Sequence, residues 1–178
     1  LGDGSSTSTE RGTPALVSLA DVVDISGGRE HVLALKSDGT VEAWGSDQNG
    51  AIGNGLPLTN VSTPVTVPGL TDVVDVDDGH YHSLALKSDG TVWGWGQNFL
   101  GQLAQGNDAS PKASPVQWGS ISDAVAVVGG RDMTYVLDAA GTLWCSGGNG
   151  LECGTDPRPE ITDRHREATA ARVTVGSR

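Results

Sequence analysis

Short apolar runs alternate with turn-forming residues along most of the chain. Two of these runs, Ser83–Leu86 and Val92–Trp95, flank the sequence Ser88-Asp89-Gly90-Thr91. An Asp-Gly pair between apolar runs is a strong short-range signal for a β-hairpin, because glycine readily adopts the positive φ that such a turn requires. The pattern therefore predicts two antiparallel strands joined by a turn at Gly90.

The same stretch occurs three times at a fixed spacing. Residues 25–55 and 76–106 align without gaps, and the glycines at 28, 39 and 45 are each followed by another glycine 51 residues later. A third copy follows at the same offset, with Gly130 and Gly141 in place of Gly79 and Gly90. A fixed period of this length is typical of solenoids, propellers and arrays. The predicted units are the tail of a preceding repeat (1–20), two full repeats (21–70 and 71–120) and a degenerate third repeat (121–178) with an insertion near 155–170.

Each repeat contains four short runs that read as strands. The fourth begins at a Thr-Pro or Ser-Pro pair, and proline suits the start of an edge strand because it cannot donate to a ladder. In the second run, Leu33 and Leu35 face one side of the sheet and Ala34 the other, so both sides are apolar. Stacking such sheets as blades around an axis covers both faces. The expected strands are Asp21–Ile25, Val32–Leu35, Val41–Trp44 and Thr63–Val67, then Asp72–Val76, Ser83–Leu86, Val92–Trp95 and Ser114–Trp118, then Ala124–Val128, Thr134–Leu137, Leu143–Ser146 and Ala171–Val175, with Thr13–Val17 in the tail.

These patterns predict an all-β chain, an incomplete β-propeller of about three four-stranded antiparallel blades. Propellers typically have 4–8 blades, so three cannot close a ring. The first and last blades are then expected to expose apolar faces lined by residues such as Leu33, Leu35 and Tyr135. The rest of the propeller is expected from a longer parent chain or from a second copy. The start at Leu1 inside a repeat, without an initiator methionine, favours the longer chain.

The charge balance excludes some partners. The chain has 178 residues with 11 basic and 22 acidic side chains, for a formal net charge of −11. Nucleic-acid binders carry basic stripes, and anionic membranes attract basic segments, so neither partner is expected. No apolar run approaches the length of a membrane helix. The acidity is interpreted as a contribution to solubility rather than as a sign of a basic partner.

Six potential metal ligands crowd one segment, namely Asp72, Asp75, Asp77, Asp78, His80 and His82. Oxygen and imidazole groups of this kind bind metal ions. However, Asp77 and Asp78 do not recur in the first repeat, and His82 occupies the structural His position that His31 shares. The segment is therefore interpreted as solvated acids, and no metal or cofactor is expected.

No catalytic motif stands out either. The Gly-rich loops at 45–55 and 96–106 lack the Lys-Ser/Thr ending of a P-loop and the helix that follows it. Ser, His and Asp all occur, but no nucleophile elbow or other triad motif appears. The chain is not expected to be an enzyme.

Two cysteines, Cys145 and Cys153, are too few for a disulfide framework. They fall at a strand end and in the loop that follows it. A disulfide between them and a pair of buried thiols both stay open, because the sequence does not fix the separation of their Cα atoms. The compartment is not fixed, although a bacterial secreted or surface location is favoured.

The repeats resemble those of one known family. The matching segments are Gly79–Leu86 (GHYHSLAL), Asp89–Trp93 (DGTVW) and Trp95–Leu103 (WGQNFLGQL). They are similar to repeats of the regulator of chromosome condensation family, a seven-bladed β-propeller, and the similarity covers essentially the whole chain. The first repeat follows the pattern with His31, Trp44 and Gly45. The third departs from it, with Met133 in place of the repeat's His and Ser146 in place of its Trp.

Two positions between the loop glycine and the structural His vary in size and charge among the copies. These candidate partner-binding residues are Arg29, Glu30, His80, Tyr81, Arg131 and Asp132. Their spacing places all six at one end of the propeller, in the loops that join the first and second strands. In relatives within this family the matching face carries charged and aromatic residues that bind a partner, and loops on rigid scaffolds often carry function.

The resemblance implies a non-catalytic module that presents a loop face to a protein partner of unknown identity. Two alternatives stay open. One is guanine-nucleotide exchange on a small GTPase, the activity of the family's namesake, although the protruding β-wedge on which that activity relies does not interrupt these repeats. The other is inhibition of an enzyme, as in the propeller-type β-lactamase inhibitor, which an inhibition assay tests.

Overall fold

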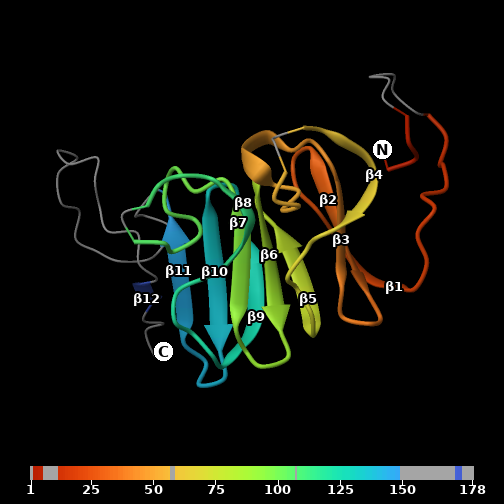
Figure 1. Ribbon diagram of the computed structural model, residues 1–178. Coiled ribbons are helices and arrows are strands. Elements are labelled where there is room, and N and C mark those ends of the chain that lie inside the picture. The colour runs from red at the N-terminus through yellow and green to blue at the C-terminus, as the bar shows by residue number, and fades with distance from the viewer. Residues whose placement is uncertain (1, 6–11, 57–58, 107, 149–170, 174–178) are drawn as a thin grey trace.

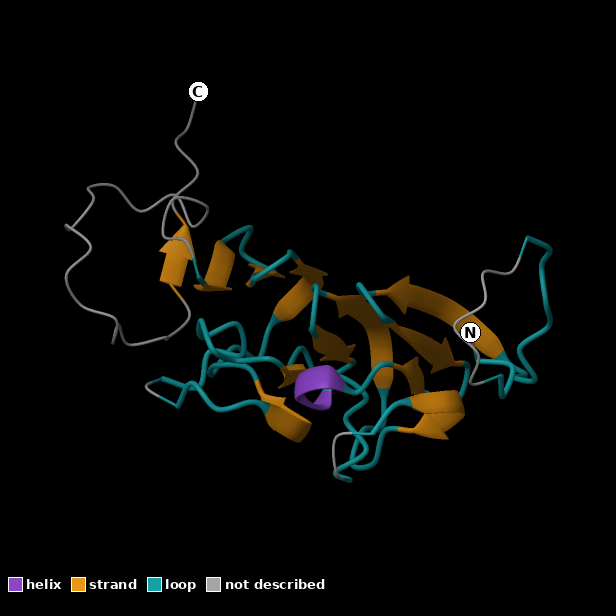
Figure 2. Cartoon of the chain, turned by 90° about the horizontal axis from the view of Figure 1, so that it is seen from above, coloured by secondary structure: helices purple, strands orange, loops and turns teal. Residues whose placement is uncertain are grey.

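The computed structural model describes residues 2–5, 12–56, 59–106, 108–148 and 171–173. Twelve strands within these residues form three antiparallel sheets of four, which stand side by side as blades (Figures 1 and 2). Blade 1 contains β1 (Val22–Gly27), β2 (His31–Lys36), β3 (Val41–Gly45) and β4 (Val61–Thr66), with the short 3₁₀ turn η1 (Gln48–Gly50) in the loop after β3. Blade 2 contains β5 (Val73–Asp78), β6 (His82–Lys87), β7 (Val92–Gly96) and β8 (Lys112–Gln117). Blade 3 contains β9 (Ala124–Gly129), β10 (Met133–Asp138), β11 (Leu143–Gly147) and β12 (Ala171–Val173).

This arrangement confirms the prediction of an all-β incomplete propeller with four-stranded antiparallel blades. Each sheet lies within one predicted repeat, while the boundaries of the repeats stay predictions. The predicted insertion near 155–170 lies outside the described residues. Within the described part there is no helix with the length and apolarity needed to span a bilayer.

The predicted hairpins are present in all three blades. Gly39, Gly90 and Gly141 lie in the turns between the second and third strands, with φ values of 78°, 78° and 80°. A β-carbon is disfavoured in this left-handed region, so glycine fits the turn at low cost. The turns fix the register of the strands, so that Leu35 pairs with Val41 and Leu86 with Val92.

The blades pack through two separate apolar cores. Between blades 1 and 2, Leu33 and Leu35 lie in one cluster with Val73 and Val76. Between blades 2 and 3 an equivalent cluster contains Leu84, Leu86, Ala124 and Val127. The first strand of each blade packs against the first two strands of the blade before it, β5 against β1 and β2, and β9 against β5 and β6. Each blade therefore covers the second strand of the blade before it.

This packing corrects the predicted open face of blade 1. Leu33 and Leu35 are buried against blade 2 rather than exposed, because alternation along a strand defines two faces without saying which one meets a neighbour. The open side of blade 1 instead carries Val22 and Ile25, and Ile25 is 67% exposed. At the other end of the array, the open side of blade 3 includes Leu137, which is also exposed.

The prediction of a strand at Thr13–Val17 is wrong. The described residues of this segment belong to no ladder. In blades 1 and 2 the proline-containing strand pairs with the third strand of its own blade, as β4 does with β3. Among the described residues before Thr13 there is no strand with which the segment could pair.

We expect the isolated 178-residue chain to self-associate through its two end faces. Large exposed apolar patches on soluble proteins mark interfaces or aggregation sites. Size-exclusion chromatography with light scattering should show a concentration-dependent mass, and Ile25→Lys combined with Leu137→Lys should shift it toward the monomer. Val74→Lys serves as the control. Val74 is 54% exposed, but it lies on β5 of blade 2, which has a neighbouring blade on each side and so belongs to neither end face. A concentration-independent monomer for the unmodified chain would contradict this expectation.

Candidate functional site

The six candidate partner-binding residues lie where their spacing predicts. Arg29 and Glu30 connect β1 to β2, and the equivalent pairs connect β5 to β6 and β9 to β10. Backbone hydrogen bonds join the three loops in a row, because the Arg29 amide donates to the His80 carbonyl and the His80 amide to the Arg131 carbonyl, both at 3.2 Å. The loops therefore form one continuous surface. We call Arg29, Glu30, His80, Tyr81, Arg131 and Asp132 the loop face.

Side-chain contacts hold part of the loop face in place. The Arg29 guanidinium carbon lies 5.4 Å from the centre of the Tyr81 ring, and Nη1 of Arg29 donates to the Tyr81 hydroxyl. The His80 and Tyr81 rings lie 5.1 Å apart. At the other end, Arg131 Nε lies 3.4 Å from Asp132 Oδ2, while the Arg131 side chain is 79% exposed. The loop face thus presents aromatic and cationic groups that are ordered before any partner binds.

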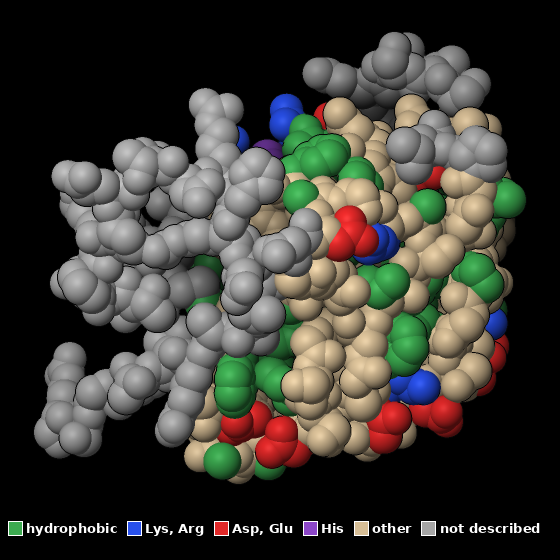
Figure 3. All heavy atoms as spheres, turned by 60° about the vertical axis from the view of Figure 1, so that its left-hand side comes forward, with side chains coloured by type: hydrophobic (Ala, Val, Ile, Leu, Met, Phe, Trp, Pro, Cys, Tyr) green, Lys and Arg blue, Asp and Glu red, His purple; other side chains and the backbone are tan. Residues whose placement is uncertain are grey.

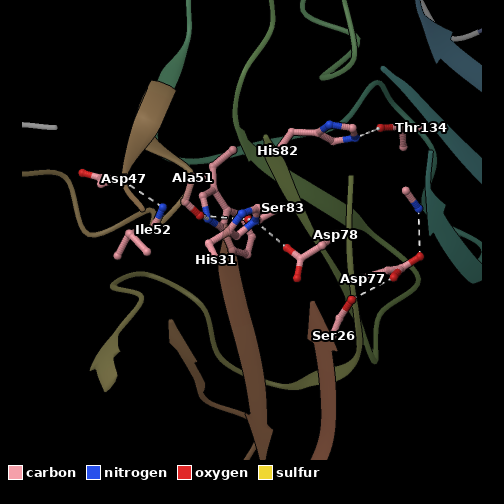
Figure 4. Close-up of polar contacts among 12 residues, drawn as sticks. Ser26, His31, Asp47, Ala51, Ile52, Asp77, Asp78, His82, Ser83 and Thr134 are labelled. Atoms are coloured by element: carbon pink, nitrogen blue, oxygen red, sulfur yellow. Dashed lines mark hydrogen bonds and ion pairs between the residues drawn. The ribbon is translucent and has the colours of Figure 1, made fainter. Parts of the chain in front are cut away.

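A buried polar row lies between blades 1 and 2 (Figure 4). His31 Nε2 lies 2.8 Å from Asp78 Oδ1 and 2.9 Å from Ser83 Oγ, and Ser83 Oγ donates to the Ala51 carbonyl at 2.9 Å. The side chains of His31 and Asp78 are essentially inaccessible to solvent. Burial raises the pKa of Asp78. The interpretation of Asp78 as a solvated acid is therefore wrong, because its sequence neighbours do not reveal that it faces a histidine 47 residues away.

The Ser-His-Asp set of this row does not have the geometry of a hydrolase triad. In a triad, one imidazole nitrogen contacts the serine and the other contacts the carboxylate. Here Asp78 and Ser83 meet the same nitrogen of His31, and the Ser83 hydroxyl donates to the Ala51 carbonyl. The row links three strands, β2, β5 and β6, and a loop of neighbouring blades, so its geometry is that of an interblade tie.

The interface between blades 2 and 3 has a different polar contact. His82 Nε2 lies 3.1 Å from Thr134 Oγ1, and Gly129 stands where the first interface has Asp78. His82 consequently lacks a carboxylate partner among the described residues. Burial, followed by the charge of His31, lowers the pKa of His82 from 6.5 to about 4. His82 is therefore held in its neutral form.

We expect this histidine to make the fold sensitive to acid. Its folded pKa of about 4 lies below the unfolded value of 6.5. The stabilisation is therefore complete above pH 6.5 and is lost as the pH falls toward 4, by about 3 kcal/mol in total. His82→Met with Thr134→Val should remove this pH dependence, because Met133 fills the corresponding position of blade 3. Urea unfolding at several pH values measures the slope, and His80→Met, at a partly exposed position in the loop between β5 and β6, should leave the slope intact.

The remaining candidate groups lie apart from the loop face. Cys145 is buried in β11, whereas Cys153 lies outside the described residues, so their pairing stays a prediction. Asp77 bridges blades, since it accepts hydrogen bonds from Ser26 Oγ at 2.9 Å and from the Gly129 amide at 2.8 Å. Across the described residues, no three His, Cys, Asp or Glu side chains come together in a group that could hold a metal ion.

Two exposed neighbours of the loop face were missed by sequence reasoning. Phe99 and Leu100 are 53% and 49% exposed in the loop between β7 and β8. The available signal was a difference between repeats, since Gln48 and Asn49 occupy the same positions in the first repeat. The glycines around these two positions predict a turn, and they do not indicate which side chains the turn exposes.

Comparison with known sequences identifies the repeat. Two family descriptions, both of the regulator of chromosome condensation (RCC1) repeat, match the chain. One covers residues 22–51 and 73–102, and the other covers 38–86 and 89–137. The chain belongs to the RCC1 repeat family. The resemblance inferred from the repeat motifs is thereby confirmed.

Relatives in the RCC1 repeat family are considerably longer than this chain. Protein pim1 from Schizosaccharomyces pombe is 40% identical over an alignment of 118 residues, and the match covers 57% of this chain and 22% of pim1. The probable E3 ubiquitin-protein ligase HERC6 from Homo sapiens is 37% identical over an alignment of 133 residues, and the match covers 72% of this chain and 13% of HERC6. The chain thus spans well under half of either RCC1-type relative.

Among solved structures, Prp20p from Saccharomyces cerevisiae has a similar fold. The TM-score is 0.69 at 22% identity, over 85% of this chain and 38% of Prp20p. That structure was described together with the binding of Prp20p to Gsp1p and histones. At this level of identity the comparison establishes the RCC1-type propeller fold and nothing further about this chain.

Proposed function

We propose that this chain binds a protein partner through the loop face and performs no chemistry of its own. The observation that supports this most directly is the Arg29–Tyr81 stack, in which Arg29 is exposed and Tyr81 partly exposed, on loops joined by the row of interblade backbone hydrogen bonds. Tyrosine and arginine are enriched among the residues that dominate binding energy at interfaces. Groups already ordered before binding lose less conformational entropy when a partner arrives.

Two proteins can be tested first as binding partners of this chain. Prp20p shares the fold and is described as binding Gsp1p and histones. Purified Gsp1p and purified histones are therefore the probes for titration calorimetry against the 178-residue chain. Binding of either is expected to depend on Tyr81 and Arg131, the aromatic and the most exposed cationic members of the loop face.

Tyr81→Ala and Arg131→Ala are expected to weaken binding by about tenfold or more each. Their melting temperatures should stay close to that of the unmodified chain, because exposed loop substitutions usually change stability by only about 0.5 kcal/mol. Ser88→Ala, in an exposed hairpin turn at the opposite end of blade 2, is the control and should bind normally. Unchanged affinity in both loop-face variants, or a large drop in their melting temperatures, would contradict the proposal.

A second candidate function is guanine-nucleotide exchange, which the fold shared with the Gsp1p-binding Prp20p favours. The two functions differ in one measurement. Release of a fluorescent nucleotide from Gsp1p should stay at its intrinsic rate if the chain only binds, and should accelerate if it exchanges. The Tyr81→Ala variant shows whether any acceleration requires the loop face.

A further inference from the structure

The loop that carries Phe99 and Leu100 is fixed at both ends by buried polar groups. The Gln97 amide donates to the Tyr81 carbonyl at 2.8 Å, so the loop starts directly beside the loop face. Further along, Asn98 Oδ1 accepts the Leu103 amide at 2.9 Å and Gln102 Oε1 accepts the Leu100 amide at 3.1 Å. Asn98 and Gln102 are fully buried. The two apolar side chains are therefore displayed by an ordered backbone.

The same loop also reaches the Arg131–Asp132 end of the loop face. A β-carbon on Gly148 would lie only 2.5 Å from Leu100 Cδ1, so the backbone of Gly148 passes directly against Leu100. The Gly148 amide in turn donates to the Asp132 carbonyl at 3.1 Å. Figure 3 shows hydrophobic side chains gathered at the upper edge of the molecule beside a basic side chain and a histidine. Phe99 and Leu100 thus extend the loop face outward between blades 2 and 3.

The fold itself does not require apolar residues at these positions. The equivalent loop of blade 1 has the same buried anchor position, with Asp47 Oδ1 accepting the Ile52 amide at 3.1 Å where Asn98 accepts Leu103. Its tip nevertheless carries Gln48 and Asn49. Leu100 packs against Gly148, but about half of each of the two side chains stays exposed, which costs solubility, so a benefit in binding accounts for the pair best.

We propose that the loop face together with Phe99 and Leu100 binds an extended segment of the partner protein that carries an acidic side chain next to an apolar one. This deepens the proposed function and rests on it. Within the described residues Arg131 pairs through Nε with Asp132, and its side chain is 79% exposed. A guanidinium of this kind binds a carboxylate with two parallel hydrogen bonds. Phe99, Leu100 and the Tyr81 ring supply the apolar surface for the neighbouring side chain.

A random-peptide phage library selected on the immobilised 178-residue chain tests the proposal. Enriched peptides are expected to carry Asp or Glu adjacent to Leu, Ile, Phe or Trp. Fluorescence polarisation with the enriched peptides should then show about tenfold or greater weakening for Phe99→Ser with Leu100→Ser. Arg131→Ala should remove the preference for the acidic residue. The matched control is Gln48→Ser with Asn49→Ser, which changes the same loop in blade 1 and should bind normally.

The outcomes separate this inference from the proposed function. If Tyr81→Ala weakens binding while Phe99→Ser with Leu100→Ser does not, the extended surface is refuted and the loop face stands. If none of these variants changes binding, both proposals fail. Enriched peptides without acidic residues, or no enrichment over an uncoated surface, overturn the acidic–apolar segment. Thermal melts followed by circular dichroism should confirm that each variant retains its fold.

Discussion

Replacing Trp118 by alanine is expected to lower the free energy of unfolding by about 3–5 kcal/mol, the usual range for a large aromatic side chain in a core. Trp118 directly follows β8 and is fully buried in the cluster between blades 2 and 3. Its indole nitrogen donates to the Gln102 carbonyl at 3.0 Å and lies 2.9 Å from Ser146 Oγ. Truncation would leave a large cavity and remove the hydrogen bonds of the indole, while the Ser146 hydroxyl still donates to the Gln102 carbonyl at 2.8 Å. Urea unfolding followed by circular dichroism measures the loss.

The other interface fills the same space with a tryptophan from a different strand. Between blades 1 and 2, Trp95 of β7 donates its indole N–H to the Ala51 carbonyl at 2.9 Å. Ala51 and Gln102 are equivalent, since they lie 51 residues apart. By the same spacing Val67 corresponds to Trp118, and Trp95 to Ser146. In each interface, therefore, one indole donates a hydrogen bond to the equivalent backbone carbonyl. Blade 2 supplies this indole in both interfaces.

A third position changes together with the two tryptophans. A β-carbon on Gly53 would lie 2.5 Å from the indole nitrogen of Trp95, so that position must be glycine. The equivalent residue in the second interface is Ala104, which is tolerated because Ser146 replaces the tryptophan there. The combined change Ala104→Gly, Trp118→Val and Ser146→Trp would therefore convert the second interface into the first.

The combined variant is expected to recover most of the stability that Trp118→Val loses alone. Ser146→Trp alone should destabilise the chain, because the new indole would meet both Ala104 and Trp118. Strong non-additivity is the expected sign of residues that share one space. If the effect of the triple substitution equals the sum of the single effects, the two tryptophans do not substitute for one another.

The repeat explains why so much of the fold could be predicted from sequence. Hairpins depend on local features, such as glycine at the left-handed turn position between two apolar runs, and a fixed period carries them from blade to blade. Packing between blades is harder to predict from sequence. The prediction for Leu33 and Leu35 is wrong because alternation of side chains along a strand does not distinguish the two faces of the sheet. Ser146 looked like a lost tryptophan because its replacement, Trp118, lies outside the aligned position.

The candidate site shows the same division. Spacing alone placed Arg29, His80 and Arg131 at one end of the propeller, since equivalent positions in a repeat occupy equivalent places. The stack of Arg29 on Tyr81 joins two different blades, so it depends on the rotation between them, which no local pattern contains. The pairing of Asp78 with His31 was hidden for the same reason.

Asp78→Ala is expected to destabilise the chain by about 1–3 kcal/mol, the usual cost of leaving a buried polar group without its hydrogen-bond partner. The substitution would leave His31 Nε2 with Ser83 as its remaining partner in the described structure. Asp78→Asn should cost much less, because the amide retains the shape and can still bond to the imidazole. Asp78 Oδ2 has no hydrogen-bond partner among the described groups, so loss of its charge also removes an uncompensated desolvation cost.

The pH dependence distinguishes Asp78 from His82. Burial raises the folded pKa of Asp78 above its ordinary value of 3.8, so ionising this carboxyl costs stability as the pH rises through the folded pKa. His82 acts in the opposite direction, since its neutral form is favoured and stability is lost on acidification. Asp78→Asn should therefore remove the increase in the free energy of unfolding that protonation of Asp78 gives at low pH. The decrease caused by protonation of His82 should remain. A double-mutant cycle with His31→Ala should give a coupling of about 1–3 kcal/mol. A coupling near zero would show that the carboxylate and imidazole contribute independently, and the interblade tie would then reduce to packing.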